Sequence, residues 1–398
     1  MTTGPGISRT PLPKGFKAGG VNSGVRRYRP DYGVLISEPE AVGVGVFTRN
    51  ECKAAPIQYC MGLLPSKHVR AIVTNSGQAN AATGEEGREK NWRMALSIAK
   101  VIGCLPHQVL TASTGVIGKQ IEIEKLEACA SEVVEKATDF GETFALAILT
   151  TDLVPKTIAQ DVKLSNGTVR ITGICKGSGM IHPNMGTMLG YLLTDAILPT
   201  AVAQDFVRKA ADVSFNMISV DGDSSTNDCV FLLANGASGV PLANDDDYRI
   251  FQDALFNVSK ILAQAIARDG EGASKLIQVD IRHCGDEALA RKAARGVTVS
   301  PLIKTAIHGE DPNWGRILAR LGAEGIPAAS LDRMTLKIQD HLLFENGAPV
   351  EFDKTAVRSS LRSDTVVIDI DLRSGIESAT AWGCDLSKRY VDINTDYN

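Results

Sequence analysis

Thr187 is the residue whose sequence context best suits a nucleophile. It follows Gly186 at the end of a glycine-rich segment, in which Gly177 and Gly179 permit backbone angles that other residues avoid and a His-Pro-Asn turn bends the chain. In such a setting the threonine hydroxyl can attack the preceding peptide bond, which breaks the chain and leaves Thr187 with a free α-amino group. A threonine paired with its own amine is a known way to activate a weak hydroxyl nucleophile.

The same segment also has a structural interpretation. The apolar run Met188–Leu193 that follows is typical of a buried strand or helix, with Thr187 as a helix cap. Gly-Thr pairs are common, and self-cleavage needs backbone strain that a sequence does not display. The residues alone therefore favour a glycine-rich loop.

An acyl transfer also needs hydrogen-bond donors for the oxyanion of its tetrahedral intermediate. The turn Ser113-Thr114-Gly115 suits this task, because the N–H of Gly115 and the hydroxyl of Thr114 can converge on one oxygen. A strand-ending turn with local hydroxyl bonds explains the same residues equally well.

Lys176 and Glu271 are the opposite charges that we predict to bind an α-amino acid. Each lies in a glycine-rich stretch, where a side chain can reach a small ligand. The structural alternatives are a surface lysine and a solvated glutamate.

Asp221, Asp223 and Asp228 place carboxylates close together, as a calcium or magnesium loop would. The segment lacks the following glutamate of an EF-hand, and its serine, threonine and asparagine side chains can tie an acidic turn together. We predict no metal site here, and no cofactor.

Composition limits the class of protein. The chain has 398 residues, of which 44% are hydrophobic and 22% charged, with a net charge of -4. A chain without basic runs is not expected to bind nucleic acid or an anionic membrane. The first twenty residues lack the apolar core of a secretory signal, no apolar run approaches the roughly 20 residues of a membrane span, and the eight cysteines show no metal or redox spacing. These features favour a cytoplasmic protein with reduced thiols.

The hydrophobic pattern predicts a mixed α and β chain with two lobes, 1–280 and a smaller 281–398. Periodicity alone does not separate α/β from α+β. Helices are expected at 85–102, 122–136, 199–213 and 245–267, and strands at 33–36, 43–47, 71–74, 230–235 and 365–372.

Several blocks resemble one family. The stretch Lys-Gly-Ser-Gly-Met-Ile-x-Pro-Asn-Met-x-Thr-Met-Leu, here 176–189, resembles the cleavage motif of the ornithine acetyltransferases, also called glutamate N-acetyltransferases, of arginine biosynthesis. Further blocks match in the same order, which is more specific than any one motif. They are 74–84, 113–118, 150–152, 219–228, 269–273 and 304–316.

This resemblance implies a fold and a processing step. The expected fold is α+β, with a layered αββα sandwich core and a smaller α/β C-terminal lobe. Cleavage between Gly186 and Thr187 would give fragments 1–186 and 187–398, which would assemble as a heterotetramer with two copies of each.

The resemblance also implies a reaction and its residues. Thr187 would take acetyl from N2-acetyl-L-ornithine and pass it to L-glutamate by a ping-pong mechanism, without a cofactor, and some family members also accept acetyl-CoA. Residues matching Thr114 and Gly115 form the oxyanion hole, and the substrate lies among residues matching Thr150, Lys176, Thr187, Glu271 and Asn394.

Three positions depart from the family pattern. His182 and Gly186 stand where alanine is usual, and the sequence stops at Asn398 where members continue to a terminal serine or threonine. Glycine before Thr187 adds flexibility at the bond to be cleaved. The alternatives that remain are an N-terminal-threonine amidase or aminopeptidase, a paralogous acetyltransferase of a specialised pathway, and a non-catalytic binding protein with the same fold.

Overall fold

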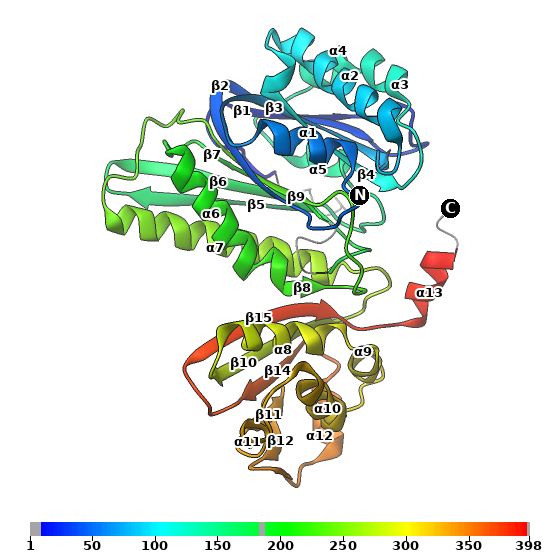
Figure 1. Ribbon diagram of the computed structural model, residues 1–398, viewed down its shortest axis with the longest axis vertical. Coiled ribbons are helices and arrows are strands. Elements are labelled where there is room, and N and C mark those ends of the chain that lie inside the picture. Colours follow the sequence, from blue (N-terminus) through cyan, green and yellow to red (C-terminus); the bar gives the residue numbers. More distant parts are fainter. Residues whose placement is uncertain (1–8, 183–187, 396–398) are drawn as a thin grey trace, which may run out of the picture. The chain divides into compact units, whose positions relative to one another are not determined.

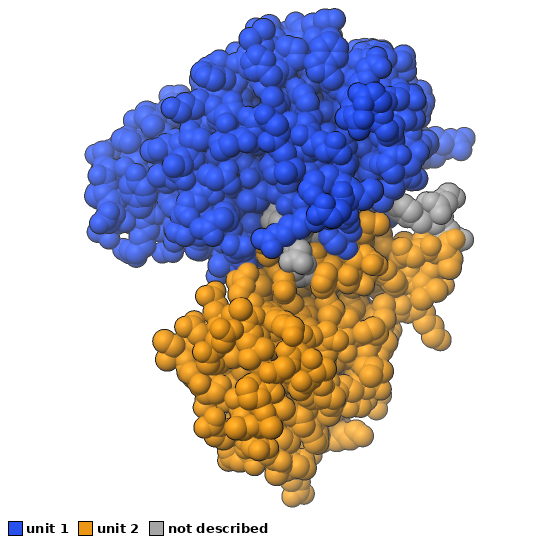
Figure 2. Space-filling model, in the orientation of Figure 1, with its two compact units in different colours: residues 1–177, 184–215, 224–262 blue, residues 178–183, 216–223, 263–398 orange. Residues whose placement is uncertain are grey.

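The computed structural model describes residues 9–182 and 188–395. The chain forms two compact units, which Figure 2 colours separately. The first comprises Met1–Gly177, Asn184–Phe215 and Ser224–Leu262, and the second comprises Ser178–Pro183, Asn216–Asp223 and Ala263–Asn398. Each unit has its own β-sheet.

The sheet of the first unit has eight strands. Their order is β4-β3-β2-β9-β7-β6-β5, and β1 pairs with β2 as well. The strands are β1 (Phe16–Val21), β2 (Tyr32–Phe47), β3 (Ser66–Gln78), β4 (Val109–Val116), β5 (Lys156–Leu164), β6 (Gly167–Lys176), β7 (Leu189–Thr194) and β9 (Cys229–Ala234).

The long strand β2 divides this sheet into two layers, and it can be followed as the curved blue ribbon of Figure 1. Its first part pairs with β1 and β3, its second part pairs with β9, and the register shifts between Ile36 and Gly43. Side chains that alternate along each strand therefore face two different cores. Leu35 and Ile72 pack with Tyr191 and Phe231 of the other layer, whereas the neighbours of Leu35 and Ile72 pack outward against helices.

Helices cover both outer faces of these layers. Figure 1 shows α2, α3 and α4 on one side of the strands and α6 and α7 on the other. The core between the layers also receives residues of α1 and α5. The helices are α1 (Ala55–Leu63), α2 (Gly84–Ile102), α3 (Ile123–Ala128), α4 (Ala130–Glu135), α5 (Glu142–Ala147), α6 (Thr200–Val213) and α7 (Asp245–Arg268), with short 3-10 turns at Pro106–Gln108 and Phe215–Met217. The predicted αββα sandwich is confirmed.

The second unit is a seven-stranded sheet with helices, in the order β13-β12-β11-β14-β10-β15-β8. This confirms the smaller lobe of mixed helices and strands. Its strands are β8 (Ile218–Ser219), β10 (Leu276–Cys284), β11 (Thr335–Ile338), β12 (His341–Glu345), β13 (Ala348–Pro349), β14 (Thr365–Asp371) and β15 (Glu377–Cys384), and its helices are α8 (Glu287–Val299), α9 (Pro301–His308), α10 (Trp314–Glu324), α11 (Ala328–Leu331), α12 (Lys354–Ser360) and α13 (Lys388–Thr395).

Two local predictions were wrong in their boundaries. The strands expected at 33–36 and 43–47 are one strand, β2, because the chain stays extended through its exposed residues 38–40. The helix expected at 122–136 is two helices, α3 and α4, which meet at Cys129, where ψ is 1°. The other expected elements are confirmed: α2, α6, α7, β9 and β14 begin and end close to the expected residues, and the strand expected at 71–74 is part of β3.

Two absences bear on the class of protein. Within residues 9–182 and 188–395, no helix combines the length and the apolar character that a membrane crossing requires. No two of the eight cysteines, all of which lie in the described ranges, form a disulfide.

Candidate active site

Thr187 and Gly186 lie outside the described residues, so the site is built from the residues around that position in the sequence. The chain is described again from Met188, which is buried and directly precedes β7. Because β7 is a central strand with partners on both sides, the residue after Thr187 belongs to a rigid part of the first unit. The apolar run after Thr187 is therefore a buried strand.

The predicted turn at Thr114 and Gly115 is the irregular end of strand β4, where the pairing with β3 shifts register; residues 113–118 are called the oxyanion turn below. These two strands run parallel, and Gly115 is paired with Gly77. Gly115 has φ +131°, and a Cβ on it would lie 2.2 Å from the carbonyl carbon of Gly77. Only glycine fits this position, because any side chain would meet the neighbouring backbone. Thr114 is buried and precedes this constrained glycine.

Lys176, the last residue of β6, points its ammonium group at this turn. Its Nζ donates a hydrogen bond of 3.3 Å to Oγ1 of Thr114. Only 3% of Lys176 is exposed, so the alternative of a surface lysine is wrong. The structure thus brings together three of the predicted site residues, Thr114, Gly115 and Lys176.

A buried carboxylate, Asp152, balances the charge of Lys176. Its Oδ1 accepts hydrogen bonds of 2.7 Å from Nζ of Lys156 and from the N–H of Gly177, and Lys176 Nζ lies 3.9 Å from its Oδ2. Burial alone would raise the pKa of Asp152. The charges of Lys176 and Lys156 and these hydrogen bonds outweigh that effect and lower the pKa of Asp152 to about 2. Asp152 is therefore ionised and places a negative charge beside Lys156 and Lys176.

Thr150 is placed by the same carboxylate. Its N–H donates a hydrogen bond of 3.2 Å to Oδ2 of Asp152, and its carbonyl accepts a hydrogen bond from Arg26. Asp152 thus connects the loop of Thr150 with the end of β6. Asp152 was missed as a site residue, although it lies in the Thr-Thr-Asp block, because its two lysine partners are not evident from a linear sequence.

In the second unit, Glu271 and Asn394 form a contact of their own. Asn394 Nδ2 donates a hydrogen bond of 2.8 Å to Oε2 of Glu271, and the Glu271 N–H donates to the carbonyl of Ser178. A Cβ on Gly179 would lie 2.4 Å from the carboxyl carbon of Glu271, so glycine permits this approach. Glu271 is only 8% exposed, which rejects the alternative of a solvated glutamate, and Asn394 belongs to α13. Lys176 belongs to the first unit and Glu271 to the second, so the binding of one amino acid by both residues stays a prediction.

Part of the cleavage motif, Met180 and Ile181, is anchored by Asp221 in the second unit. Its carboxylate accepts the N–H groups of Met180, which has a positive φ of 56°, and of Ile181. His182, one of the departures from the family pattern, has Nδ1 3.3 Å from Oγ of Ser219. Burial lowers the pKa of His182, which keeps its imidazole neutral at pH 7.

The acidic turn at 221–228 uses its carboxylates for backbone hydrogen bonds. Asp221 accepts from the residues just named, and Asp228 accepts from the N–H of Met188. Among the residues of 9–182 and 188–395, no three histidine, cysteine or acidic side chains form a group that could hold a metal ion.

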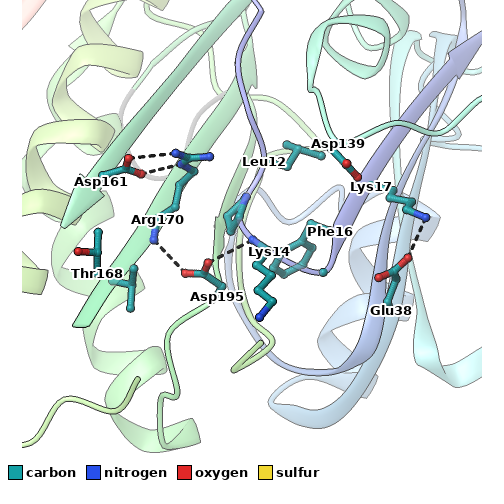
Figure 3. Close-up of a pocket in the computed structure, with 13 residues that line it drawn as sticks. Leu12, Lys14, Phe16, Lys17, Glu38, Asp139, Asp161, Thr168, Arg170 and Asp195 are labelled. Atoms are coloured by element: carbon teal, nitrogen blue, oxygen red, sulfur yellow. Dashed lines mark hydrogen bonds and ion pairs between the residues drawn. The ribbon is translucent and has the colours of Figure 1, made fainter. Parts of the chain in front are cut away.

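A cavity of about 630 Å³ lies elsewhere in the first unit (Figure 3). Its charged side chains largely neutralise one another. Arg170 makes two hydrogen bonds to Asp161, and Lys17 forms an ion pair of 2.8 Å with Glu38. None of the predicted site residues lines this cavity, and we assign no ligand to it.

Comparison with known proteins identifies the family. A family model described as the ArgJ family matches residues 17–398. The chain is 42% identical over 399 residues to the "Arginine biosynthesis bifunctional protein ArgJ" of Synechocystis sp., with 97% of this chain and 96% of the relative covered. It is 44% identical over 393 residues to the protein of the same name from Symbiobacterium thermophilum, with 97% of each covered. The chain belongs to the ArgJ family.

A solved structure supports the same relationship. It is the crystal structure of the "Arginine biosynthesis bifunctional protein argJ" from Bacillus halodurans, with a TM-score of 0.51 and 36% identity. The match covers 53% of this chain and 100% of that chain.

Proposed function

We propose that this chain transfers acetyl from N2-acetyl-L-ornithine to L-glutamate in arginine biosynthesis, through an acetyl ester on Thr187. The observation that carries the proposal is the buried contact of Lys176 with Thr114, beside the tight turn at Gly115, in an ArgJ-family chain. Such a site offers preorganised donors to an oxyanion, which acyl transfer requires.

Lys176 fixes the direction of the Thr114 hydroxyl. An ammonium group has three donors and no acceptor, so Oγ1 of Thr114 must accept the hydrogen bond from Lys176. The hydroxyl proton of Thr114 is then available to another acceptor. Together with the N–H of Gly115, this proton forms the oxyanion hole of the proposed reaction.

The reaction proceeds in two half-reactions. The amine of Thr187 takes the hydroxyl proton as Oγ attacks the acetyl carbon, the amide C–N bond breaks, and the proton leaves on the α-amine of ornithine. The α-amine of glutamate then attacks the ester, the C–O bond breaks, and Oγ recovers its proton. The atoms balance without a cofactor.

Thr187 acquires its free amine by self-cleavage in this proposal. Attack of its hydroxyl on the carbonyl of Gly186 gives an ester, which water hydrolyses to fragments 1–186 and 187–398. The C-terminal fragment, residues 187–398, would make up about 53% of the chain. The family resemblance further favours a cytoplasmic heterotetramer of two copies of each fragment.

Charged groups that the structure buries would recognise the amino acid part of both substrates. Lys176 would bind the α-carboxylate of both substrates, and Glu271 would bind the α-amino group that glutamate brings and that ornithine gains as it leaves, aided by Thr150 and Asn394. One pocket can serve donor and acceptor in turn, because ornithine leaves before glutamate enters.

The mass of the purified protein tests the cleavage. Two fragments that begin at Met1 and Thr187 are expected, and Thr187→Ala should remain a single inactive chain. Thr187→Ser should retain some cleavage, because a hydroxyl stays in place. An active protein that consists only of an unbroken chain would refute the mechanism.

A steady-state assay with different donors and acceptors tests the reaction. Acetylornithine plus glutamate should give N-acetylglutamate, with parallel lines in initial-rate plots. Acetyl release without glutamate would instead identify an amidase, and an absence of any acyl-enzyme would identify a binding protein. Acetyl-CoA plus glutamate, measured separately, shows whether this chain shares a second activity with relatives that are named bifunctional.

A further inference from the structure

Asn227, which lies two positions before the first residue of β9, holds the oxyanion turn. Its Nδ2 donates hydrogen bonds of 2.8 Å to the carbonyl of Ser113 and 2.6 Å to the carbonyl of Ala79. Ser113 directly precedes Thr114. The hydroxyl of Thr226 donates to Oδ1 of Asn227 at 2.6 Å, which fixes the amide with its NH₂ group toward the two carbonyls.

Asp228, the next residue, holds the strand that follows the proposed nucleophile. Its Oδ1 accepts the N–H of Met188 at 2.9 Å, and the N–H of Cys229 donates to the carbonyl of Met188 at 3.2 Å. Both polar backbone groups of Met188 are thus satisfied by two consecutive residues. Met188 directly follows Thr187 in the chain.

Neither side chain is available to solvent or to a large ligand. Asn227 is 5% exposed and Asp228 is 1% exposed. Burial raises the pKa of Asp228 well above its usual value, and the Met188 N–H and the charge of Lys176 oppose this only in part. The side chain of Asp228 therefore holds the Met188 N–H from a position that solvent does not reach.

We propose that Asn227 and Asp228 are positioning residues, which keep the oxyanion turn and the strand after Thr187 in a fixed register. This inference rests on the proposed function. Because Asn227 and Asp228 are adjacent in the chain, their hydrogen bonds couple the position of Ser113 to the position of Met188. An attacking atom that is displaced by about 1 Å can lose about 10²-fold in rate.

The test exchanges the two side-chain types, so that an amide stands at position 228 and a carboxylate at position 227. Asp228→Asn keeps an acceptor for the Met188 N–H and should retain kcat within about 5-fold, whereas Asp228→Ala should lower kcat by about 10²-fold. Asn227→Asp turns an oxygen toward two carbonyl oxygens and should lower kcat at least as much. KM for acetylornithine should change by less than about 3-fold, because the substrate groups are untouched.

Two further variants keep the test interpretable. Thr226→Val removes only the hydroxyl that orients Asn227, and it should lower kcat about 10-fold at a nearly native melting temperature, even where Asn227→Asp fails to fold. Asp223→Asn, in the exposed part of the same turn, is the matched control and should behave as wild type.

Rates are measured per cleaved, folded protein. An unchanged kcat in both Asp228→Ala and Thr226→Val would overturn the inference. The inference would also fail if Asp228→Asn were as inactive as Asp228→Ala, because a hydrogen-bond acceptor at position 228 would then not be sufficient. Wild-type protein that neither cleaves itself nor transfers acetyl would refute the proposed function instead.

Discussion

Nζ of Lys176 lies 3.3 Å from Oγ1 of Thr114, so a buried cation determines which way a buried hydroxyl can donate. Neither residue is near the other in sequence. The contact exists because β6 and β4 belong to the two layers that face each other in the first unit. The proposed oxyanion hole is therefore built across the layers of the sandwich.

This relationship predicts a non-additive pair of variants. Thr114→Ala removes one oxyanion donor and should lower kcat by about 10²-fold. Lys176→Met removes the cation that orients this donor and should lower kcat by about 10- to 100-fold. The double variant should cost little more than Thr114→Ala, because Lys176 acts on kcat through Thr114.

The measurement is a double-mutant cycle on cleaved enzyme. Lys163→Met, an exposed lysine of β5, is the matched control and should leave kcat unchanged. Fully additive losses would show that the two residues act independently. A rise in KM that appears only with Lys176→Met reports its direct contact with substrate.

Two glycines of one turn should differ in their tolerance of alanine. Gly115→Ala places a Cβ against the backbone of Gly77 and should destabilise the protein by at least about 3 kcal/mol, with loss of activity. Gly118 also has a positive φ, but nothing lies within 4 Å of its Cβ position, so Gly118→Ala should cost about 1–2 kcal/mol. Urea unfolding of both variants measures the difference. Equal losses would mean that backbone angle, not the contact with β3, selects glycine at 115.

The sequence indicated the local parts of this site and not their partners. Gly115 could be predicted because a turn after an apolar strand has a local signature. The burial of Lys176 could not, because its partner Asp152 is 24 residues away and a lysine in a glycine-rich stretch is usually exposed. The role of Asp228 was hidden for the same reason, since Met188 is 40 residues away from it.

The fold shows the same limit. Periodicity identified α2, α6 and α7, where an apolar stripe repeats along one helix. It divided β2 into two strands, because the exposed residues Glu38, Pro39 and Glu40 interrupt the apolar pattern between two halves that pair with different partners. The layered sandwich came from resemblance to a family, since strand pairing over long separations leaves no local pattern.

Asp152 predicts a dependence of stability on pH. Its pKa is about 2 in the folded protein against an ordinary 3.8, so it stabilises the fold above about pH 4, and this contribution disappears as the pH falls toward 2. Asp152→Asn should lower the free energy of unfolding by about 3 kcal/mol at pH 7, because Lys156 and Lys176 lose a charged partner. Urea unfolding between pH 7 and pH 2.5 should show the difference from wild type narrowing below pH 4. If the difference in the free energy of unfolding between wild type and Asp152→Asn stayed constant with pH, the loss of stability would come from packing and not from charge.

Glu271 predicts a loss of substrate binding without a loss of stability. Glu271→Gln keeps the size of the side chain and an oxygen for the hydrogen bond from Asn394, so the melting temperature should change by no more than about 2 °C. The negative charge that would bind an α-amino group is removed, so KM for glutamate and the inhibition constant of the product ornithine should each rise by about 10- to 100-fold. Glu351→Gln, an exposed glutamate of the same unit, is the control and should match wild type in both measurements. A melting temperature that falls by about 10 °C or more would make Glu271 structural, and unaltered kinetics with both substrates would remove it from the binding site.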